Sequence, residues 1–324
     1  MSASLDALAA VVARGLSGSP KRLPAWVFYD AAGSALYEQI TELDEYYPTR
    51  TEKKIFEHHA ESMVDMLVDA RPLSLIELGA GTAAKTVVLL RALAKRVATT
   101  FVPVDVSPSA LSVARARVGH ELPEVEVREL IATHERALSK LETLPGKKVI
   151  LFIGSSIGNY EDDEAVHLLS GVSRALGPDG VFVLGTDLKK SPARLVAAYD
   201  DAQGVTARFN LNALARINRE LGGRFLLERF AHVALWNEER SRIEMHLESR
   251  GPQEVFIEAL GRTFHFEDGE RIHTESSVKY DLDHVDRLLE ASGLARKRSF
   301  HDEDRWFAVH LITPHLGASQ ATTA

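Results

Sequence analysis

The chain has 324 residues, of which 45% are hydrophobic and 26% charged, so its composition is that of a globular protein. This length favours two domains or one large domain. The formal net charge of −8 argues against binding to nucleic acid or to anionic membranes, because both require clusters of basic residues. The chain contains no cysteine, which excludes disulfides, thiol nucleophiles and thiolate metal centres.

The N-terminal part of the chain is predicted to be helical. An apolar run over residues 7–13 is bounded by an acidic and a basic residue, which favours a surface helix over a signal peptide. Further helices are expected over 34–43 and 49–66, and Thr49 and Glu52 have the spacing of a capping box at the start of the second of these. No apolar run approaches the ~18 residues of a membrane span, so we expect a cytoplasmic protein.

Strands and helices then alternate along the chain. Short apolar runs predict strands, and the segments between the first of them follow the period of a helix. Such alternation is typical of βαβ units and predicts an α/β fold, with a Rossmann-like parallel sheet covered by helices on both faces. The predicted strands are 73–78, 100–105, 125–130, 149–153 and 181–184, with helices over 83–97 and 110–122.

The alternation stops near Leu188. A helical region is followed by a series of short strands with antiparallel character, and the chain then returns to a helix and a hairpin. We therefore expect one domain of residues 1–188 plus 280–324, including the N-terminal helices, and a smaller inserted α+β domain of residues 189–279. The predicted elements are a helical region over 190–224, strands 230–237, 242–249, 254–257 and 262–266, a helix over 282–292, and a hairpin of 295–301 and 306–313.

The first candidate ligand site follows the first predicted strand. Gly79 and Gly81 would let the backbone approach a ligand closely, and Asp105, 24 residues beyond Gly81 at the end of the next strand, could accept both ribose hydroxyls. The motif is not the dinucleotide fingerprint, because its third glycine position is Ala84, and it is not a P-loop. A nucleoside ligand without pyrophosphate, such as S-adenosylmethionine, fits this pattern. The alternative is a glycine-rich turn with a solvated aspartate.

Two further motifs contain polar groups suited to an amino acid. Asn159 lies in a Gly/Ser-rich segment after the fourth strand, where its amide could hold a carboxylate or amine; the alternative is a helix-capping turn. Glu275 and Ser277 would face the same side of a strand and could hold an imidazole N–H; the alternative is a solvated edge strand. The 13 histidines form no recognisable metal site, and spacing does not choose among Tyr29, Tyr46, Tyr47 and Tyr199.

Several specific motifs occur in a fixed order along the chain, from Pro20 to about Leu311. With these motifs the chain resembles the L-histidine Nα-methyltransferases of ergothioneine biosynthesis. The motifs include Phe28-Tyr29-Asp30, Glu45-Tyr46-Tyr47-Pro48-Thr49-Arg50, Glu77-Leu78-Gly79-Ala80-Gly81, Phe101-Val102-Pro103-Val104-Asp105, Gly154-Ser155-Ser156-Ile157-Gly158-Asn159 and Thr274-Glu275-Ser276-Ser277.

The resemblance implies a class I methyltransferase sheet with an inserted substrate-binding domain. It implies three successive methyl transfers from S-adenosylmethionine to the α-amino group of histidine, which give hercynine, and it implies no metal. Cofactor contacts would come from Tyr29, Gly79, Gly81, Lys85, Asp105 and Gly154. Substrate contacts would come from Asn159 and Tyr199 at the carboxylate and amine, from Tyr46, Glu275 and Ser277 at the imidazole, and from Met245 as a wall of the pocket; Tyr46, Asn159 and Glu275 are the candidate catalytic residues.

One pair of residues departs from the family pattern. The family usually has an aspartate followed by an aromatic residue at the adenine, and the matching positions here are Thr133 and His134. A hydroxyl can bond the adenine amino group and an imidazole can stack on the base, but an ionised acceptor is lost. We therefore expect weaker cofactor binding, unless a neighbour such as Glu135 compensates.

Two other functions remain open at this point. The same chemistry could act on another amino acid such as tryptophan or an indole amine, which needs the Glu275 and Ser277 pair less. A non-catalytic S-adenosylmethionine-binding sensor is the second alternative. A nicotinamide oxidoreductase is disfavoured by the missing third glycine. We expect a monomer that takes a small-molecule substrate, with neither nucleic acid nor a membrane as partner.

Overall fold

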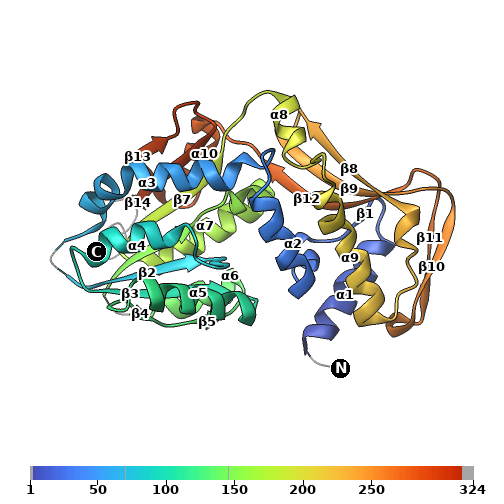
Figure 1. Cartoon of the computed structure of the whole chain (residues 1–324), viewed down its shortest axis with the longest axis horizontal. Coiled ribbons are helices and arrows are strands. Elements are labelled where there is room, and N and C mark those ends of the chain that lie inside the picture. Colours follow the sequence, from blue (N-terminus) through green and yellow to red (C-terminus); the bar gives the residue numbers. More distant parts are fainter. Residues whose placement is uncertain (1–2, 70, 145, 316–324) are drawn as a thin grey trace, which may run out of the picture. The chain divides into compact units, whose positions relative to one another are not determined.

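The computed structural model describes residues 3–69, 71–144 and 146–315. These residues form two compact units (Figure 1). Unit 1 consists of the chain up to Tyr47 together with Lys190–Val278, and unit 2 consists of Pro48–Lys189 together with the chain from Lys279.

Unit 2 contains an eight-stranded sheet in the order β13-β14-β7-β6-β2-β3-β4, with β5 also paired to β3. The strands from β2 to β7 run parallel, and the β13–β14 hairpin adds an antiparallel edge. This arrangement confirms the predicted Rossmann-like α/β sheet. Its strands are β2 (Leu73–Leu78), β3 (Thr99–Asp105), β4 (Glu126–Val127), β5 (Leu130–Ile131), β6 (Lys147–Phe152), β7 (Val181–Asp187), β13 (Leu294–His301) and β14 (Phe307–Pro314).

Helices cover both faces of this sheet (Figure 1). The apolar sides of α3, α4 and α5 share one core cluster with strand residues such as Leu75, Phe101 and Val183. Helix α7 packs against strands β6, β7, β13 and β14 and against the helices α6 and α10. The sequence pattern does not predict α6 or α7. The helices of unit 2 are α3 (Tyr47–Leu67), α4 (Thr86–Ala94), α5 (Pro108–Glu121), α6 (His134–Leu141), α7 (Asp162–Leu176) and α10 (Leu282–Ala291), with a 3-10 turn η2 (Ser156–Asn159).

Unit 1 is an α+β assembly around a four-stranded sheet in the order β1-β12-β9-β8. Strand β12 pairs with β9 at Glu275 and Ser277, whereas β1 pairs only with Ile272 and His273 of β12; Glu275 is half-buried and Ser277 is buried, so neither is a fully solvated edge residue. The strands are β1 (Lys21–Arg22), β8 (Phe230–Asn237), β9 (Arg242–Ser249), β12 (Arg271–Val278) and a separate pair, β10 (Gln253–Ile257) and β11 (Arg262–Phe266). The helices are α1 (Ala3–Ser17), α2 (Ala31–Thr41), α8 (Pro192–Ala197) and α9 (Val205–Leu221), with 3-10 turns η1 (Ala25–Phe28), η3 (Leu227–Arg229) and η4 (Glu258–Leu260).

The N-terminal segment groups differently from the predicted domain division. We expected residues 1–188 to belong together, but the chain up to Tyr47 groups with unit 1. The reason is long-range contact: β1 pairs with β12, and Asn212 of α9 donates hydrogen bonds to Phe28 O and to Asp30 Oδ1, each at 3.0 Å. At the other end of the insert, the division at Lys190 and Val278 lies within one residue of the predicted boundaries.

Two local predictions are wrong. Helix α3 begins at Tyr47, so Thr49 lies inside the helix and Glu52 is not part of a capping box; its carboxylate binds groups far away in the sequence. Helix α4 begins at Thr86 rather than Ala83, because positive φ angles at Gly79, Gly81 and Ala83 form a turn first.

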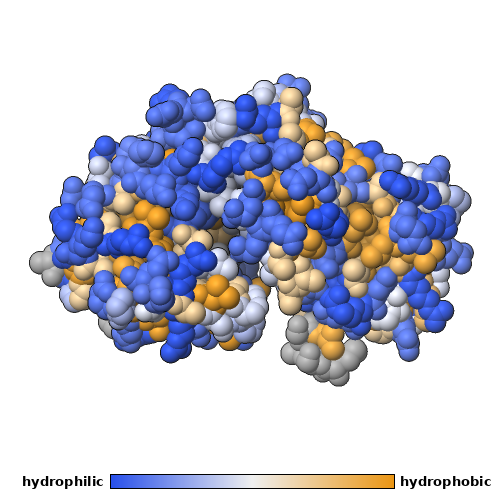
Figure 2. Space-filling view, in the orientation of Figure 1, coloured by the Kyte–Doolittle hydropathy of each residue, from blue (hydrophilic) through white to orange (hydrophobic). Residues whose placement is uncertain are grey.

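Within the described residues, no helix combines the length and apolar character needed to cross a membrane. The face shown in Figure 2 is mainly hydrophilic, with apolar patches between.

Candidate functional site

The glycine turn after β2 keeps the backbone open at the carboxyl end of the parallel strands. Gly79 and Gly81 have φ angles of 71° and 51°, which a side chain would disfavour. The N–H groups of Gly79 and Ala80 donate to Val104 O of β3 at 2.9 and 3.0 Å. A Cβ at Gly79 would come within 3.5 Å of His134 Nε2. The turn therefore leaves room for a ligand next to the backbone, at the position where ligands bind in open parallel sheets.

Asp105 is held rigidly at the end of β3. Its Oδ2 accepts a hydrogen bond from Gly81 N at 3.0 Å, and its Oδ1 accepts one from Ser107 N at 2.9 Å. Two carboxylate oxygens together offer about four lone-pair directions, so further donors can still be bound. The pair of Asp105 and the glycine turn therefore fits the ribose of a nucleoside, which is what S-adenosylmethionine presents.

Glu52 is a site residue that the sequence analysis missed. Its side chain is fully buried, both carboxylate oxygens lie 2.9 Å from Gly154 N, and Oε2 forms an ion pair with Lys85 Nζ. Gly154 has a φ of 77°, and a Cβ on Gly185 would overlap the Glu52 carboxylate. One carboxylate thus holds both Lys85 and Gly154, two residues predicted to contact the cofactor. A signal exists in the sequence, because Glu52 lies on the same helical stripe as Ile55 and Phe56.

Glu77 is a second buried carboxyl group in the same region. Burial raises the pKa of Glu77 to about 8, while Thr86 and Lys85 act in the opposite direction. Glu77 is therefore mostly protonated at neutral pH. Its Oε2 has no hydrogen-bond partner within the described residues.

His134 lies beside the glycine turn, at the start of α6. Its Nδ1 is 3.0 Å from the Tyr160 hydroxyl, and its ring stands edge-to-face against Phe152 with centroids 5.1 Å apart. Burial lowers the pKa of His134, so the ring is neutral at pH 7. Thr133 is exposed and its hydroxyl makes no capping hydrogen bond, and Glu135 is exposed in the first turn of α6. The neutral aromatic ring fits a stacking role better than an ionic one.

Asn159 ends the 3-10 turn η2 and is exposed. The loop before it is fixed from both sides: Ser155, with a φ of 57°, accepts a hydrogen bond from Asp187 N at 2.8 Å, and the Tyr280 hydroxyl donates to Ile157 O at 3.2 Å. The N-cap of α7 is Glu161, so Asn159 is not a capping residue. Its amide is available to a ligand on a well-supported loop.

Unit 1 contains a cluster of tyrosines. The ring of Tyr46 stands edge-to-face between Tyr37 and Tyr199, with centroid distances of 6.4 and 6.1 Å, and Tyr29 lies 5.7 Å from Tyr37. Burial raises the pKa of Tyr46 well above its usual value, and the neighbouring Tyr37 and Tyr199 add to this effect. Tyr46 therefore keeps its proton and acts as a neutral hydroxyl. Tyr47 is not part of this cluster, and its hydroxyl accepts a hydrogen bond from Lys190 Nζ at 2.8 Å.

The tyrosine cluster contacts strand β12 of the sheet through a hydrogen bond. The Tyr199 hydroxyl donates to Ser277 Oγ at 2.8 Å. Glu275 is paired with Met245 across β12 and β9, and Glu275 and Ser277 face the same side because strand side chains alternate. A β-bulge between His273 and Glu275 shifts the register just before this pair. The sequence therefore predicted correctly that Glu275 and Ser277 share a face.

His232 is a supporting residue of the same region. Asn210 Nδ2 lies 2.8 Å from His232 Nδ1, and because the amide donates, Nδ1 accepts and the proton is on Nε2. Nε2 then donates to Tyr199 O at 2.8 Å. Burial lowers the pKa of His232, which keeps this neutral tautomer at pH 7. His232 thus positions the backbone that carries Tyr199.

The predicted site residues fall into two sets, one in each unit. Unit 2 contains Gly79, Gly81, Lys85, Asp105, Thr133, His134, Gly154 and Asn159, and unit 1 contains Tyr29, Tyr46, Tyr199, Met245, Glu275 and Ser277. Tyr29, predicted to contact the cofactor, thus lies in the unit of the predicted substrate residues.

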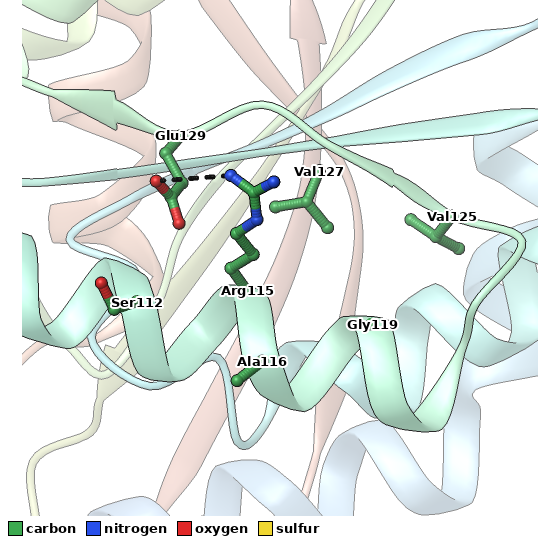
Figure 3. A pocket seen from close by; sticks show the side chains of 7 residues that line it. All are labelled: Ser112, Arg115, Ala116, Gly119, Val125, Val127 and Glu129. Carbon is green, nitrogen blue, oxygen red and sulfur yellow. Dashed lines mark ion pairs between the residues drawn. The ribbon is translucent and has the colours of Figure 1, made fainter.

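Other features of the described chain are separate from these sets. No group of three or more histidine, aspartate or glutamate side chains in residues 3–69, 71–144 and 146–315 is arranged to hold a metal ion. A cavity of about 550 Å³ lies between α5 and the β4 region (Figure 3), where Arg115 points toward Glu129 with an N–O distance of 3.9 Å. None of its lining residues is a predicted site residue.

Comparison with known proteins gives consistent results. The family described as histidine-specific methyltransferase, SAM-dependent, matches residues 8–314. The chain is 41% identical to histidine N-alpha-methyltransferase of Mycolicibacterium smegmatis, over 94% of each chain, and 42% identical to that of Mycobacterium tuberculosis, over 92% of each. It is 32% identical to ergothioneine biosynthesis protein 1 of Neurospora crassa, over 85% of this chain and 31% of that protein.

Proposed function

This chain belongs to the family of histidine-specific, S-adenosylmethionine-dependent methyltransferases, and from that premise we propose that it methylates the α-amino nitrogen of L-histidine. Three successive transfers would give the trimethylated product hercynine, the first step of ergothioneine biosynthesis. The observation that carries the proposal is the polar group of Glu275 and Ser277 on one face of β12, with the Tyr199 hydroxyl bound to Ser277, because this group suits an imidazole.

Unit 2 would bind the methyl donor. S-adenosylmethionine supplies an electrophilic methyl group on a sulfonium. The carboxylate of Asp105 would accept the ribose hydroxyls, and the turn at Gly79 and Gly81 would allow close approach of the backbone. His134 would stack on the adenine as a neutral ring. Glu52 would keep Lys85 and Gly154 in place through its ion pair with Lys85 and its hydrogen bond from Gly154 N.

Unit 1 would recognise the histidine side chain. Glu275 would accept an imidazole N–H, and the Ser277 hydroxyl, which accepts from Tyr199, would lie on the same side of the ring. A site that hydrogen-bonds a substrate N–H rejects analogues without it, by up to ~10⁴–10⁵-fold in the best cases. Met245 is a flexible apolar side chain that can adapt as the amine becomes bulkier.

The amine itself must be neutral when it attacks. Asn159 would hold the carboxylate and amine region through its amide. Tyr46 keeps its proton, so its hydroxyl can orient the substrate but does not act as a base at neutral pH. Released protons would pass to water. Holding the reactants in the right geometry supplies up to ~7–11 kcal/mol of the barrier in favourable cases.

One experiment tests the proposed function directly. The protein is incubated with S-adenosylmethionine carrying a labelled methyl group and with each of the twenty amino acids in turn, and the products are analysed by mass spectrometry. We expect only histidine to gain up to three labelled methyl groups. Transfer to tryptophan instead would indicate the alternative substrate, and cofactor binding without any transfer would indicate a sensor. An Asp105→Ala variant serves as the control that should not bind the cofactor.

A further inference from the structure

Tyr160 is a side chain of unit 2 to which the sequence analysis assigns no role. It directly follows Asn159 and directly precedes Glu161, the N-cap residue of α7, whose backbone N–H donates to Glu164 Oε2 at 3.1 Å. The backbone N–H of Tyr160 itself donates to Ile157 O at 3.2 Å. The backbone at Tyr160 is therefore held on both sides, by the 3-10 turn η2 and by the start of α7.

The ring of Tyr160 belongs to a cluster of three rings with His134 and Phe152. His134 Nδ1 lies 3.0 Å from the Tyr160 hydroxyl oxygen. Phe152, at the end of β6, stands edge-to-face against both other rings, with centroid distances of 5.1 Å to His134 and 6.4 Å to Tyr160. The packing against Phe152 thus restrains the ring planes, and the hydrogen bond decides which edge of the imidazole faces Tyr160.

The Tyr160 hydroxyl donates this hydrogen bond. Burial raises the pKa of Tyr160 to about 12, and Glu135 and Glu164 act in the same direction, so the hydroxyl keeps its proton. Burial lowers the pKa of His134, although Asp105 and Glu135 act against it, so the imidazole is neutral and one of its nitrogens is an acceptor. Among the described residues, His134 Nδ1 is the one hydrogen-bond partner of the hydroxyl. Nδ1 therefore accepts, and the ring proton is on Nε2.

The Nε2 edge of the imidazole faces the glycine turn. A Cβ on Gly79 would lie 3.5 Å from His134 Nε2. Nε2 makes no hydrogen bond to any residue that the structure describes. Asp105 borders the same turn, because its Oδ2 accepts from Gly81 N at 3.0 Å. An N–H donor that has no protein acceptor thus faces the space that the glycine backbone leaves open, which favours a ligand oxygen there.

We propose that Tyr160 is a positioning residue for the methyl donor, which orients His134 so that its Nε2–H group donates to a ribose oxygen of the bound nucleoside. The proposal rests on the proposed function, in which Asp105 and the glycine turn hold the ribose. The face of the imidazole would then lie beside the adenine while its edge contacts the sugar. Because Asn159 is the neighbour of Tyr160, the same hydrogen bond connects the donor site to the residue proposed to hold the amino acid.

Nuclear magnetic resonance of the ligand-free protein tests the orientation of His134 by itself. The histidine ring nitrogens are labelled with ¹⁵N, and the signals that are missing from a His134→Phe variant identify those of His134. We expect the proton on Nε2, and an Nδ1 signal that moves in Tyr160→Phe because its hydrogen bond is lost. Tyr47→Phe is the matched control, since it removes a hydroxyl that binds Lys190 Nζ in unit 1, and it should leave both signals in place. A proton on Nδ1 in the wild type, or an unmoved Nδ1 signal in Tyr160→Phe, would overturn the proposal.

Calorimetry with S-adenosylhomocysteine, in the absence of any amino acid, measures the effect on the donor site. His134→Phe keeps an aromatic ring but loses the N–H donor, so it should bind ~2- to 12-fold more weakly, as expected for one hydrogen bond. Tyr160→Phe should weaken binding by up to the same factor. It should cause no further loss in the His134→Phe background, because it acts through the imidazole. Tyr47→Phe should bind as the wild type does.

The outcomes separate this proposal from the proposed function. Wild-type affinity of His134→Phe, or the same loss from Tyr160→Phe in both backgrounds, would contradict the role of the His134–Tyr160 pair. Binding of S-adenosylhomocysteine without methyl transfer to histidine would contradict the proposed function alone. Absence of S-adenosylhomocysteine binding to the wild type would overturn both. A cooperative urea transition in each variant establishes that it is folded.

Discussion

Glu52 is a carboxylate on a helix face that otherwise buries apolar side chains. Ile55, Phe56 and Met63 on the same stripe are almost fully buried in the core. A buried carboxylate is tolerated there because Lys85 and Gly154 N compensate its charge and its lone pairs. The residue therefore connects the helical layer to two positions of the proposed cofactor site.

The change Glu52→Gln should weaken both stability and cofactor binding. It leaves Lys85 without its ionic partner, and breaking a buried pair costs ~3–5 kcal/mol; we expect the lower end or less, because Lys85 is partly exposed. Urea unfolding should show this loss, and calorimetry should show weaker S-adenosylmethionine binding. Glu57→Gln on the same helix is the control, since Glu57 is exposed. Equal effects of the two changes would contradict the positioning role of Glu52.

The change Glu275→Leu should reduce histidine turnover far more than cofactor affinity. It removes the acceptor for the imidazole N–H, and a missing partner for a buried polar group costs ~1–3 kcal/mol, about 5- to 150-fold in kcat/KM. Steady-state kinetics and cofactor titration measure the two effects separately. Glu254→Leu, an exposed position of the same unit, should change neither. Equal losses of turnover and cofactor binding would refute the assignment of Glu275 to the substrate.

The turn between η1 and α2 is held in place by helix α9. Asp30 caps α2 by accepting from Gly33 N at 2.7 Å, and it also accepts from Asn212 and forms an ion pair with Arg219. A side chain at Gly33 would overlap Phe28 O, so the turn is closely packed. Tyr29 lies directly before Asp30, and its orientation depends on this support.

Replacing Asp30 by alanine should destabilise the protein by at least ~1 kcal/mol. Removing the side chain of a helix N-cap usually costs about 1 kcal/mol of stability, and the loss of the Asn212 and Arg219 contacts adds to this cost. The urea midpoint measures the effect. Glu38→Ala is the control, because Glu38 is an exposed residue of the same helix. A change of less than about 0.5 kcal/mol, the size of a typical surface substitution, would show that the turn does not depend on the contacts between Asp30 and α9.

Apolar runs in the sequence predicted the buried strands, whereas a short polar helix leaves no comparable pattern. The buried parallel strands β2, β3, β6 and β7 were all predicted, since strands covered on both faces are continuous apolar runs. Helix α6 was missed because it is short and polar. The pattern also could not show that β12 is an inner strand, because its neighbours β1 and β9 come from distant parts of the chain.

Across the whole molecule, buried neutral histidines link stability to pH. Burial lowers the pKa of His310 to about 3 and that of His273 to about 4, and it also lowers the pKa of His134, His232, His246 and His301. His310 lies between Thr186 and Ser299, with hydrogen bonds of 2.8 Å to both ring nitrogens. In the unfolded chain these histidines take up protons near pH 6.5.

Unfolding should therefore become easier as the pH falls below about 6.5. In that range the unfolded state binds more protons than the folded state, so the free energy of unfolding decreases on acidification. Glu77, with its pKa raised to about 8, acts in the opposite sense between its usual value and pH 8, but it is one group against six. Urea unfolding at pH 5, 6 and 7 measures the slope. A free energy that is constant or rises toward pH 5 would contradict this expectation.

The change His310→Gln isolates the contribution of one buried histidine. It removes a group that is neutral in the folded state, so the variant should lose less stability between pH 7 and pH 5 than the wild type does. His167→Gln, at an exposed position, should leave the slope unchanged. Equal slopes in the His310 variant and the wild type would show that acid sensitivity has another origin.

The parallel sheet and the polar groups near the ends of its strands could be read from local patterns of residues. Apolar runs predict buried strands. The glycines follow β2, Asp105 ends β3 and Asn159 lies in the segment after β6, all at the edge where such sheets bind ligands. Glu275 and Ser277 could be assigned to one face because the period of a strand is two. These inferences succeed because they depend on residues close together in the chain.

The contacts between polar groups that are far apart in the chain became visible only in the folded protein. Glu52 binds Gly154 across 102 positions, and His232 binds the backbone of Tyr199 across 33. One pocket of unit 1 is lined by Lys21 of β1, Arg242 of β9 and His273 of β12, which come from distant parts of the chain. The grouping of the N-terminal segment with unit 1 has the same origin. Burial, protonation and ion pairing depend on neighbours in space, and no local pattern of residues specifies those neighbours.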